Sequence, residues 1–441
     1  MHSGESRPRV GRLGESEGVA GIGGQNFRET NRLRFVVGKG GFMTPFPTWM
    51  KLATSPQSFV HDSASKHLLR FVLKSLGKTC ICIKRMLIQT IYNVLSLCSS
   101  KDIIVFLKSS TSYEYCNLYC VYKKMNIKNY CIWIDSSKYY SISTLWTIAH
   151  AKIILLDQSS KILSNIIISK DTIVIQLWHS GGLYKKVGFD AFRRGYDYQS
   201  EYKRVQRIHG QINYFVISDS KLIQYYANAF NLKNEQIIPL GLARTDLLYQ
   251  CDKQEVKNRF YELHPEVKGK KILLYAPTFR TTQKTRTCDN NLIDINILNS
   301  QLGQEWCFIF KVHPTLIDKI SIENGWIDIS KYSYDESILL ADALITDYSS
   351  ILFDFSITKN PIFLYLPDIN EYTTTERMLY VKPENLVSEK NVAYNHTELI
   401  SIISNNNKNS NYIFKNYMSS CDGKSSLRIV DFIEQVYRRK K

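Results

Sequence analysis

The stretch ALITDYSSILFDF, residues 343–355, decides the fold, because it passes from an apolar run through a polar hinge to apolar residues at helical spacing. The run Ala343–Thr346 is typical of a buried strand, and the residues from Ile351 onward of a helix. The junction therefore predicts a helix N-terminus, where free backbone N–H groups favour an anion. Ser349 and Ser350 add hydroxyl donors and are candidate phosphate ligands, although serine is also an ordinary N-cap residue.

Two further segments end strand-like runs with a histidine: QLWHSGGLYKK at 176–186 and KVHP at 311–314. Ligands of open parallel sheets bind outside the carboxyl ends of the strands. His179 and His313 are therefore candidate catalytic groups, since a neutral imidazole accepts a proton near neutral pH. Lys185 and Lys311 are candidate phosphate-binding cations. The alternatives are a histidine satisfied by its own turn and a solvated lysine.

Two arginines extend this set of candidates. Arg280 ends the segment YAPTFR at 275–280, where its guanidinium could form a fork on a diphosphate with Thr278 as a neutral donor. Arg244 lies in the loop GLARTD, and it could either face a substrate or form a buried structural pair with Asp246.

The organisation of the chain predicts an α/β fold with two Rossmann-like halves. A chain of 441 residues implies about two domains. Apolar runs alternate with helical stretches in two series, which is a βαβ rhythm. The expected domains are 43–250 and 251–441, and the glycine-rich segment 1–42 is expected to be disordered or a non-native extension. Expected strands are 103–107, 130–134, 153–156, 173–177, 214–217, 237–240, 271–275, 307–312, 326–329, 344–346 and 361–366. A last helix at 427–437 is expected to cross back to the first domain.

Composition and charge narrow the function classes. The net charge of +17 points to a polyanionic partner, an anionic membrane surface or a phosphate-bearing substrate. The ten cysteines lack paired metal-ligand spacing, so a zinc site is not expected, and a reducing, cytoplasmic compartment is predicted. No bound cofactor is expected either. No secretory signal or spanning segment is recognised. The basic amphipathic segment 66–97 either rests on anionic lipid or is the first helix of a core. Dinucleotide and P-loop glycine motifs are missing.

Together, the motifs at 178–186, 275–280, 311–314 and 346–355, with the later PIFLY at 361–365, Asp368 and Tyr372, resemble the CDP-glycerol glycerophosphotransferase family of teichoic-acid and capsule polymerases. The resemblance covers roughly residues 170–375. It implies two Rossmann-like domains facing across a cleft, as in glycosyltransferase-B folds, with the donor bound mainly by the C-terminal domain. It also ties His179 and His313 to catalysis and Arg280, Lys311, Ser349 and Ser350 to donor phosphates.

The function implied is transfer of glycerol phosphate or ribitol phosphate from a CDP-polyol to a hydroxyl of a lipid-linked or polymeric acceptor, with release of CMP. CDP-glycerol and CDP-ribitol remain alternative donors, and a primase and a polymerase remain alternative activities. The enzyme is expected on the inner face of the cell membrane, without nucleic acid as a partner. No resident metal is assigned, although Asp347 and Asp354 could hold a magnesium ion with substrate phosphates.

Two other functions remain possible interpretations of the sequence, and the sequence departs from the family pattern in one loop. The rivals are a nucleotide-sugar glycosyltransferase of the same fold and a non-catalytic basic protein that binds polyanions, for which salt would weaken binding steeply. The departure follows Tyr372: relatives have an Arg-Gly pair and a Pro-Gly turn, whereas here Arg377 precedes Met378 and no such turn follows. The contacts of that loop are left unassigned.

Overall fold

The computed structural model describes the chain from residue 82 onward with several gaps. All described residues lie in one compact unit, His67–Lys441, and the expectations for segment 1–42 fall outside them. The described ranges are 82–108, 116–135, 141–192, 195–278, 280–282, 285–287, 292–312 and 325–439.

The first half of the unit is a six-stranded parallel sheet in the order β2-β1-β3-β4-β5-β6. Its order reverses direction between β1 and β3, so the topological switch point lies beside the ends of these strands. The strands are β1 (Ile103–Lys108), β2 (Cys131–Asp135), β3 (Ala151–Leu156), β4 (Ile173–Gln176), β5 (Tyr214–Val216) and β6 (Ile237–Ile238). The helices are one over 82–97, then α2 (Asn117–Lys124), α3 (Ile142–Ala149), α4 (Tyr198–His209) and α5 (Ile223–Phe230).

The second half is another six-stranded parallel sheet, in the order β11-β10-β7-β12-β13-β14. This is the dinucleotide-fold order, with its switch point between β7 and β12. The strands are β7 (Lys271–Tyr275), β10 (Trp306–Phe310), β11 (Ile327–Asp328), β12 (Ala343–Thr346), β13 (Ile362–Tyr365) and β14 (Val392–Ala393). A separate hairpin joins β8 (Arg280–Thr282) to β9 (Thr285–Thr287).

Two helices, α6 (Leu247–Gln250) and α7 (Lys253–Leu263), lie in the chain between the two sheets. The helices that follow strands of the second sheet are α8 (Ile295–Leu302), α9 (Tyr334–Leu340), α10 (Ile351–Phe355), α11 (Ile369–Thr375), α12 (Pro383–Val387), α13 (His396–Asn405) and α14 (Ser410–Tyr417).

Both sheets are buried on both faces, as their near-continuous apolar strands predict. In β7, Ile272 and Leu274 pack into one core, while Leu273 and Tyr275 pack into the core of the opposite face. The side chains alternate because successive residues of a strand point to opposite faces. Every strand expected from the sequence has a counterpart. Helix α3 ends at Ala149, because Ala151 already begins β3.

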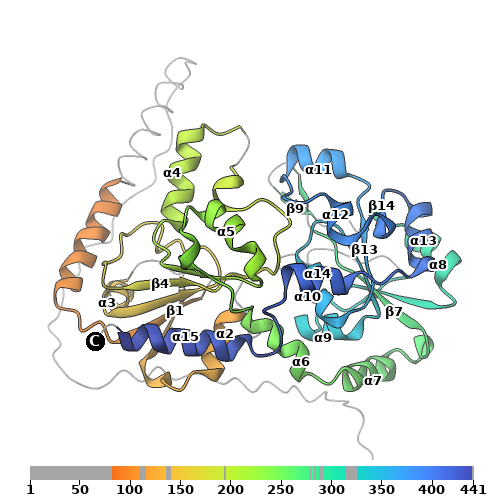
Figure 1. Cartoon of the computed structure of the whole chain (residues 1–441), viewed down its shortest axis with the longest axis horizontal. Coiled ribbons are helices and arrows are strands. Elements are labelled where there is room, and N and C mark those ends of the chain that lie inside the picture. The colour runs from red at the N-terminus through yellow and green to blue at the C-terminus, as the bar shows by residue number, and fades with distance from the viewer. Residues whose placement is uncertain are drawn as a thin grey trace, which may run out of the picture. The chain divides into compact units, whose positions relative to one another are not determined.

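The last helix, α15 (Ser425–Arg439), returns to the first sheet and packs beside α2 (Figure 1). Ile429 and Ile433 share a core with Ile104 and Phe106 of β1. Asp246 accepts hydrogen bonds from the Ser425 and Ser426 N–H groups at 3.0 and 2.7 Å, and so caps the helix. The expected return of the last helix is confirmed, and Asp246 is not the partner of Arg244.

Candidate functional site

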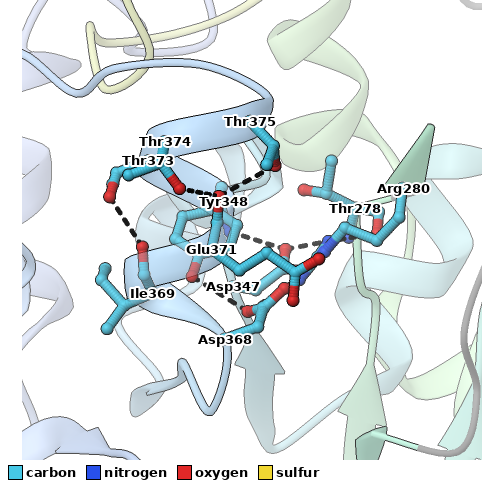
Figure 2. A network of polar contacts seen from close by, with 10 residues as sticks. All are labelled: Thr278, Arg280, Asp347, Tyr348, Asp368, Ile369, Glu371, Thr373, Thr374 and Thr375. Carbon is cyan, nitrogen blue, oxygen red and sulfur yellow. Dashed lines mark hydrogen bonds and ion pairs between the residues drawn. The ribbon is translucent and has the colours of Figure 1, made fainter. Parts of the chain in front are cut away.

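The switch point of the second sheet gathers polar side chains around Asp347, which follows β12. One carboxylate oxygen of this buried residue accepts the N–H groups of Thr278 and Tyr348 at 2.8 and 2.6 Å. The other oxygen accepts Nη1 of Arg280 at 2.8 Å. Asp347 therefore ties the end of β7 to the end of β12, as Figure 2 shows.

Arg280 is held from several sides by this cluster. Its Nε and Nη2 donate to Asp368 at 2.7 and 3.2 Å, and Nη1 also donates to the Thr278 carbonyl at 2.7 Å. The guanidinium lies 5.2 and 5.0 Å from the rings of Tyr348 and Tyr372, which stack at 3.6 Å. Burial opposes the charge of Arg280, but the two carboxylates raise its pKa above the usual range. The sequence predicted that the Arg280 guanidinium would bind a diphosphate, but in this structure it binds the carboxylates of Asp347 and Asp368.

The serine pair lies at the junction that the sequence predicted, between β12 and α10. Ser350 is the N-cap residue, and its side chain makes no capping hydrogen bond. The Ile351 N–H lies 3.4 Å from the Ser349 hydroxyl, a long contact. Both serines are partly exposed.

His179 follows β4 in the first sheet, after Trp178, whose φ is +55°. Its Nδ1 lies 3.0 Å from the backbone carbonyl of Asp157, beyond β3. With the proton on Nδ1, the lone pair of Nε2 is available to a substrate. The pKa of His179 is lowered to about 4, mainly by burial and also by the charges of Arg244, Arg377 and Lys185, while the hydrogen bond with the Asp157 carbonyl opposes the shift. The imidazole is therefore neutral at pH 7.

The loop after His179 approaches the second sheet closely. A Cβ added at Gly182, whose φ is +55°, would lie 2.2 Å from the Phe353 ring. The loop then pairs with the segment after α11: Lys186 N–H donates to the Met378 carbonyl at 2.9 Å, and Tyr380 N–H to the Tyr184 carbonyl at 2.8 Å. This pairing, termed here the bridging pair, comprises residues 184–186 and 378–380.

The bridging pair carries Lys185 toward the residues of the second sheet. Burial lowers the pKa of Lys185 to about 8, and the nearby carboxylate of Asp347 opposes that shift. Arg280 and Arg377 are also close enough to act on its charge. Lys185, which belongs to the first half of the chain, is thus within electrostatic range of Asp347 at the switch point between β7 and β12.

Arg244 and Lys311 lie in other surroundings. Arg244 Nη2 is 2.5 Å from Asp354, which also accepts the Tyr334 hydroxyl at 2.7 Å. Lys311 Nζ donates to the Tyr332 carbonyl at 2.8 Å, and burial lowers its pKa to about 8. His313 lies outside the described residues.

Asp347 and Asp354, considered from sequence as magnesium ligands, belong to two different ion pairs, with Arg280 and Arg244. Among the residues that the structure describes, no three histidine, cysteine or acidic side chains gather as a metal site.

Several residues of this site carry no motif that would reveal them. Asn117 donates to the Trp178 carbonyl at 2.7 Å and accepts the Arg244 N–H at 2.8 Å, so one buried amide holds two site segments. Asp157 contacts His179 with its backbone carbonyl, and a pattern of side chains in the sequence cannot reveal a backbone contact. Arg377 lies in the loop after Tyr372, for which the sequence predicted no contacts.

Residues 90–435 match the family model of CDP-glycerol:poly(glycerophosphate) glycerophosphotransferases. The chain belongs to this family. Among curated relatives of this glycerophosphotransferase, the teichoic acid ribitol-phosphate primase of Bacillus spizizenii is 32% identical over 298 residues, 66% of this chain and 76% of the relative. The glycerol-phosphate primase of Bacillus subtilis is 27% identical over 322 residues, 68% of this chain and 78% of the relative.

Longer relatives of the glycerophosphotransferase are matched over part of their length. The poly(ribitol-phosphate) polymerase of Bacillus spizizenii is 29% identical, and the match covers 66% of this chain and 49% of the polymerase. Among solved structures, the wall teichoic acid polymerase TagF gives a TM-score of 0.65 at 23% identity, covering 83% of this chain and 98% of that one. The likeness to TagF shows the shared fold of two parallel sheets.

Proposed function

We propose that this glycerophosphotransferase moves a polyol phosphate from CDP-glycerol or CDP-ribitol to a hydroxyl of a lipid-linked or polymeric acceptor in teichoic acid or capsule synthesis. The acceptor oxygen attacks the β-phosphorus, the bond to the α-phosphate oxygen breaks, and CMP leaves with the electron pair. His179 takes the acceptor proton. The observation that carries the proposal is a neutral His179 at a strand end, with Lys185, Arg244 and Arg377 within electrostatic range.

The charge of the site suits this role of His179. A pKa of about 4 makes the imidazole a weak base while the site is empty. A bound diphosphate would offset the surrounding positive charge and raise the proton affinity of the ring toward the operating pH, where a general base is most effective. His179 thus becomes a stronger base when the donor is present.

The donor phosphates are assigned to the second half of the site. Lys185, Ser349 and Ser350 supply a charge and two hydroxyls near Asp347 after β12, and the hydroxyl of Thr278 lies at the end of the neighbouring strand β7. Charge stabilisation is the main task in phosphoryl transfer. His313 is also proposed as a catalytic residue and Lys311 as a ligand of the donor phosphates; both follow β10 in the chain.

The two buried arginines act on the site through carboxylates. Arg280 holds Asp347 and Asp368, and Arg244 holds Asp354. We assign both arginines to donor binding as positioning residues. The arrangement proposed for the two Rossmann-like halves, 43–250 and 251–441, is that of a glycosyltransferase-B fold with the donor between them.

Peripheral attachment to the inner face of the membrane is also proposed. In the part of the chain that the structure describes, no helix is long and apolar enough to span a bilayer. The helix over 82–97 buries Tyr92, so it belongs to the core. Its other side exposes a stripe of apolar residues, which fits a lipid surface: Ile83, Met86, Leu87, Ile91, Val94 and Leu97.

The test of the function is CMP release from CDP-glycerol and, separately, from CDP-ribitol, with membranes as the acceptor source. His179→Gln should lower the rate about 10²-fold or more. His209→Gln is the matched control, because burial and the charge of Arg204 also lower the pKa of His209 to about 4, but His209 ends α4 and carries no proposed role. CMP release that persists at the wild-type rate in His179→Gln would show that His179 is not the base. A sugar donor that yields a nucleoside diphosphate would favour the glycosyltransferase alternative.

A further inference from the structure

The cations around His179 differ in their partners. Arg244 is paired with Asp354, and Arg280 with Asp347 and Asp368. Arg377 is exposed, and within the described ranges its side chain has no ion pair or hydrogen bond, although its charge acts on both His179 and Lys185. It is thus a guanidinium within electrostatic range of the proposed base, and no carboxylate of the described residues uses its donors.

The backbone explains how Arg377 reaches this place from the second half of the chain. Lys185 lies opposite Leu379 in the antiparallel bridge. Arg377 directly precedes Met378, whose carbonyl accepts the Lys186 N–H at 2.9 Å, so the bridging pair brings the Arg377 backbone next to the segment that carries Lys185.

Two buried hydroxyls without partners among the described residues belong to residues near Asp347. The Tyr184 side chain is 3% exposed, and its hydroxyl has no hydrogen-bond partner among the described residues, as is also true of the Thr278 hydroxyl. Tyr184 lies close enough to Asp347 and Tyr372 for their charges to act on it. A buried hydroxyl without a partner is costly, so a ligand that accepts a hydrogen bond there is favoured.

We infer that Arg377 is a further substrate-contacting residue, which binds phosphate oxygens of the donor diphosphate beside Lys185, with the Tyr184 and Thr278 hydroxyls as neutral donors. This inference rests on the proposed function. A guanidinium matches phosphate geometry with two parallel N–H donors, which an ammonium does not. The phosphate belongs to the donor rather than to an acceptor because the neighbours of Arg377 include Lys185 at the switch point of the second sheet.

The experiment measures CDP binding to the full chain by calorimetry, without acceptor. Arg377→Gln should weaken CDP binding roughly tenfold or more, and Arg377→Lys less. Lys382→Gln is the matched control, since it removes one exposed charge five positions further along the chain, and its affinity should stay within about twofold. Unchanged CDP affinity in Arg377→Gln with a raised KM for acceptor would assign the contact to an acceptor phosphate and overturn the donor assignment. If neither the CDP affinity nor the KM for acceptor changes in Arg377→Gln, Arg377 contacts no phosphate and the inference is refuted.

A second readout does not depend on turnover. In the ligand-free protein, Arg377→Gln should raise the pKa of His179, because Arg377 is one of the charges that lower it, whereas Lys382→Gln should not. NMR titration of the imidazole measures this and reports on folding as well. A wild-type chain that binds CDP but releases no CMP from either donor would refute the proposed function alone. An unchanged His179 pKa in Arg377→Gln would refute the placement of Arg377 alone.

Discussion

At the scale of single residues, the proton affinity of His179 is set by burial and by neighbouring cations. Binding of CDP places a diphosphate among these cations and should raise the His179 pKa by about one unit or more, equivalent to about 1.4 kcal/mol. NMR titration with and without CDP measures the change. The pKa of His209, set by burial and Arg204, should stay near 4 in both states. A His179 pKa that does not respond to CDP would place the diphosphate elsewhere.

The same two histidines predict how stability depends on pH. Their pKa values in the folded protein, about 4, lie below the ordinary 6.5. The unfolded chain therefore binds more protons between these values, and the free energy of unfolding falls as the pH drops from 6.5 to 4. His209→Gln should reduce this loss, as measured by urea unfolding at pH 7 and pH 5. An identical pH dependence in the variant would show that the pKa of His209 does not differ between the folded and unfolded chain.

Arg280 contributes to stability through its two buried ion pairs. Arg280→Ala leaves Asp347 and Asp368 without a cation, and should lower the free energy of unfolding by about 3–5 kcal/mol. The control is Arg259→Ala, which removes a surface pair with Glu336 and should cost about 0–1 kcal/mol. Urea unfolding measures both. Equal losses in the two variants would contradict the structural role of Arg280.

At the scale of elements, the glycine loop after β4 depends on close approach to α10. Gly182→Ala introduces a Cβ 2.2 Å from Phe353 at a φ of +55°, so the loop must shift and the bridging pair should weaken. We expect CMP release to fall about tenfold or more, because small displacements of catalytic groups are costly. Gly269→Ala is the matched control: its φ is +90°, but nothing lies within 4 Å of the added atom. Similar activity in the two variants would contradict the need for close approach.

At the scale of the molecule, the C-terminal helix α15 completes the core of the first sheet. Ile433→Ala removes a fully buried side chain and should cost about 2–5 kcal/mol. Leu427→Ala, on the same helix but 52% exposed, should cost much less. Hydrogen exchange of β1 and β3 should rise in the first variant. Loss of protection confined to the second sheet would contradict the packing of α15.

Attachment to a membrane is a property of the whole molecule and has its own test. Leu87→Gln with Val94→Gln removes exposed apolar area from the helix over 82–97 and should reduce co-sedimentation with anionic vesicles. Ile297→Gln, a partly exposed residue of α8, is the control. Vesicle binding that is equal in all variants would remove this helix as the contact surface.

Much of the fold follows from local patterns, because apolar periodicity and strand-end residues act over a few positions. The run at 343–355 predicted β12, its turn and α10, and the terminal apolar helix predicted the return of α15 to the first sheet. His179, Thr278 and Ser349 were recognisable as site candidates for the same reason: each follows a strand.

The partners of these residues were decided by tertiary structure alone. The sequence by itself determined two parallel sheets, the strand ends that carry chemistry, and a family motif set. Only the folded chain decided that Arg280 pairs with Asp347 and Asp368, and that Lys185 lies opposite Leu379, nearly two hundred positions away. The physical reason is that periodicity is local, whereas ion pairs, burial and proton affinity depend on groups that folding brings together from distant segments.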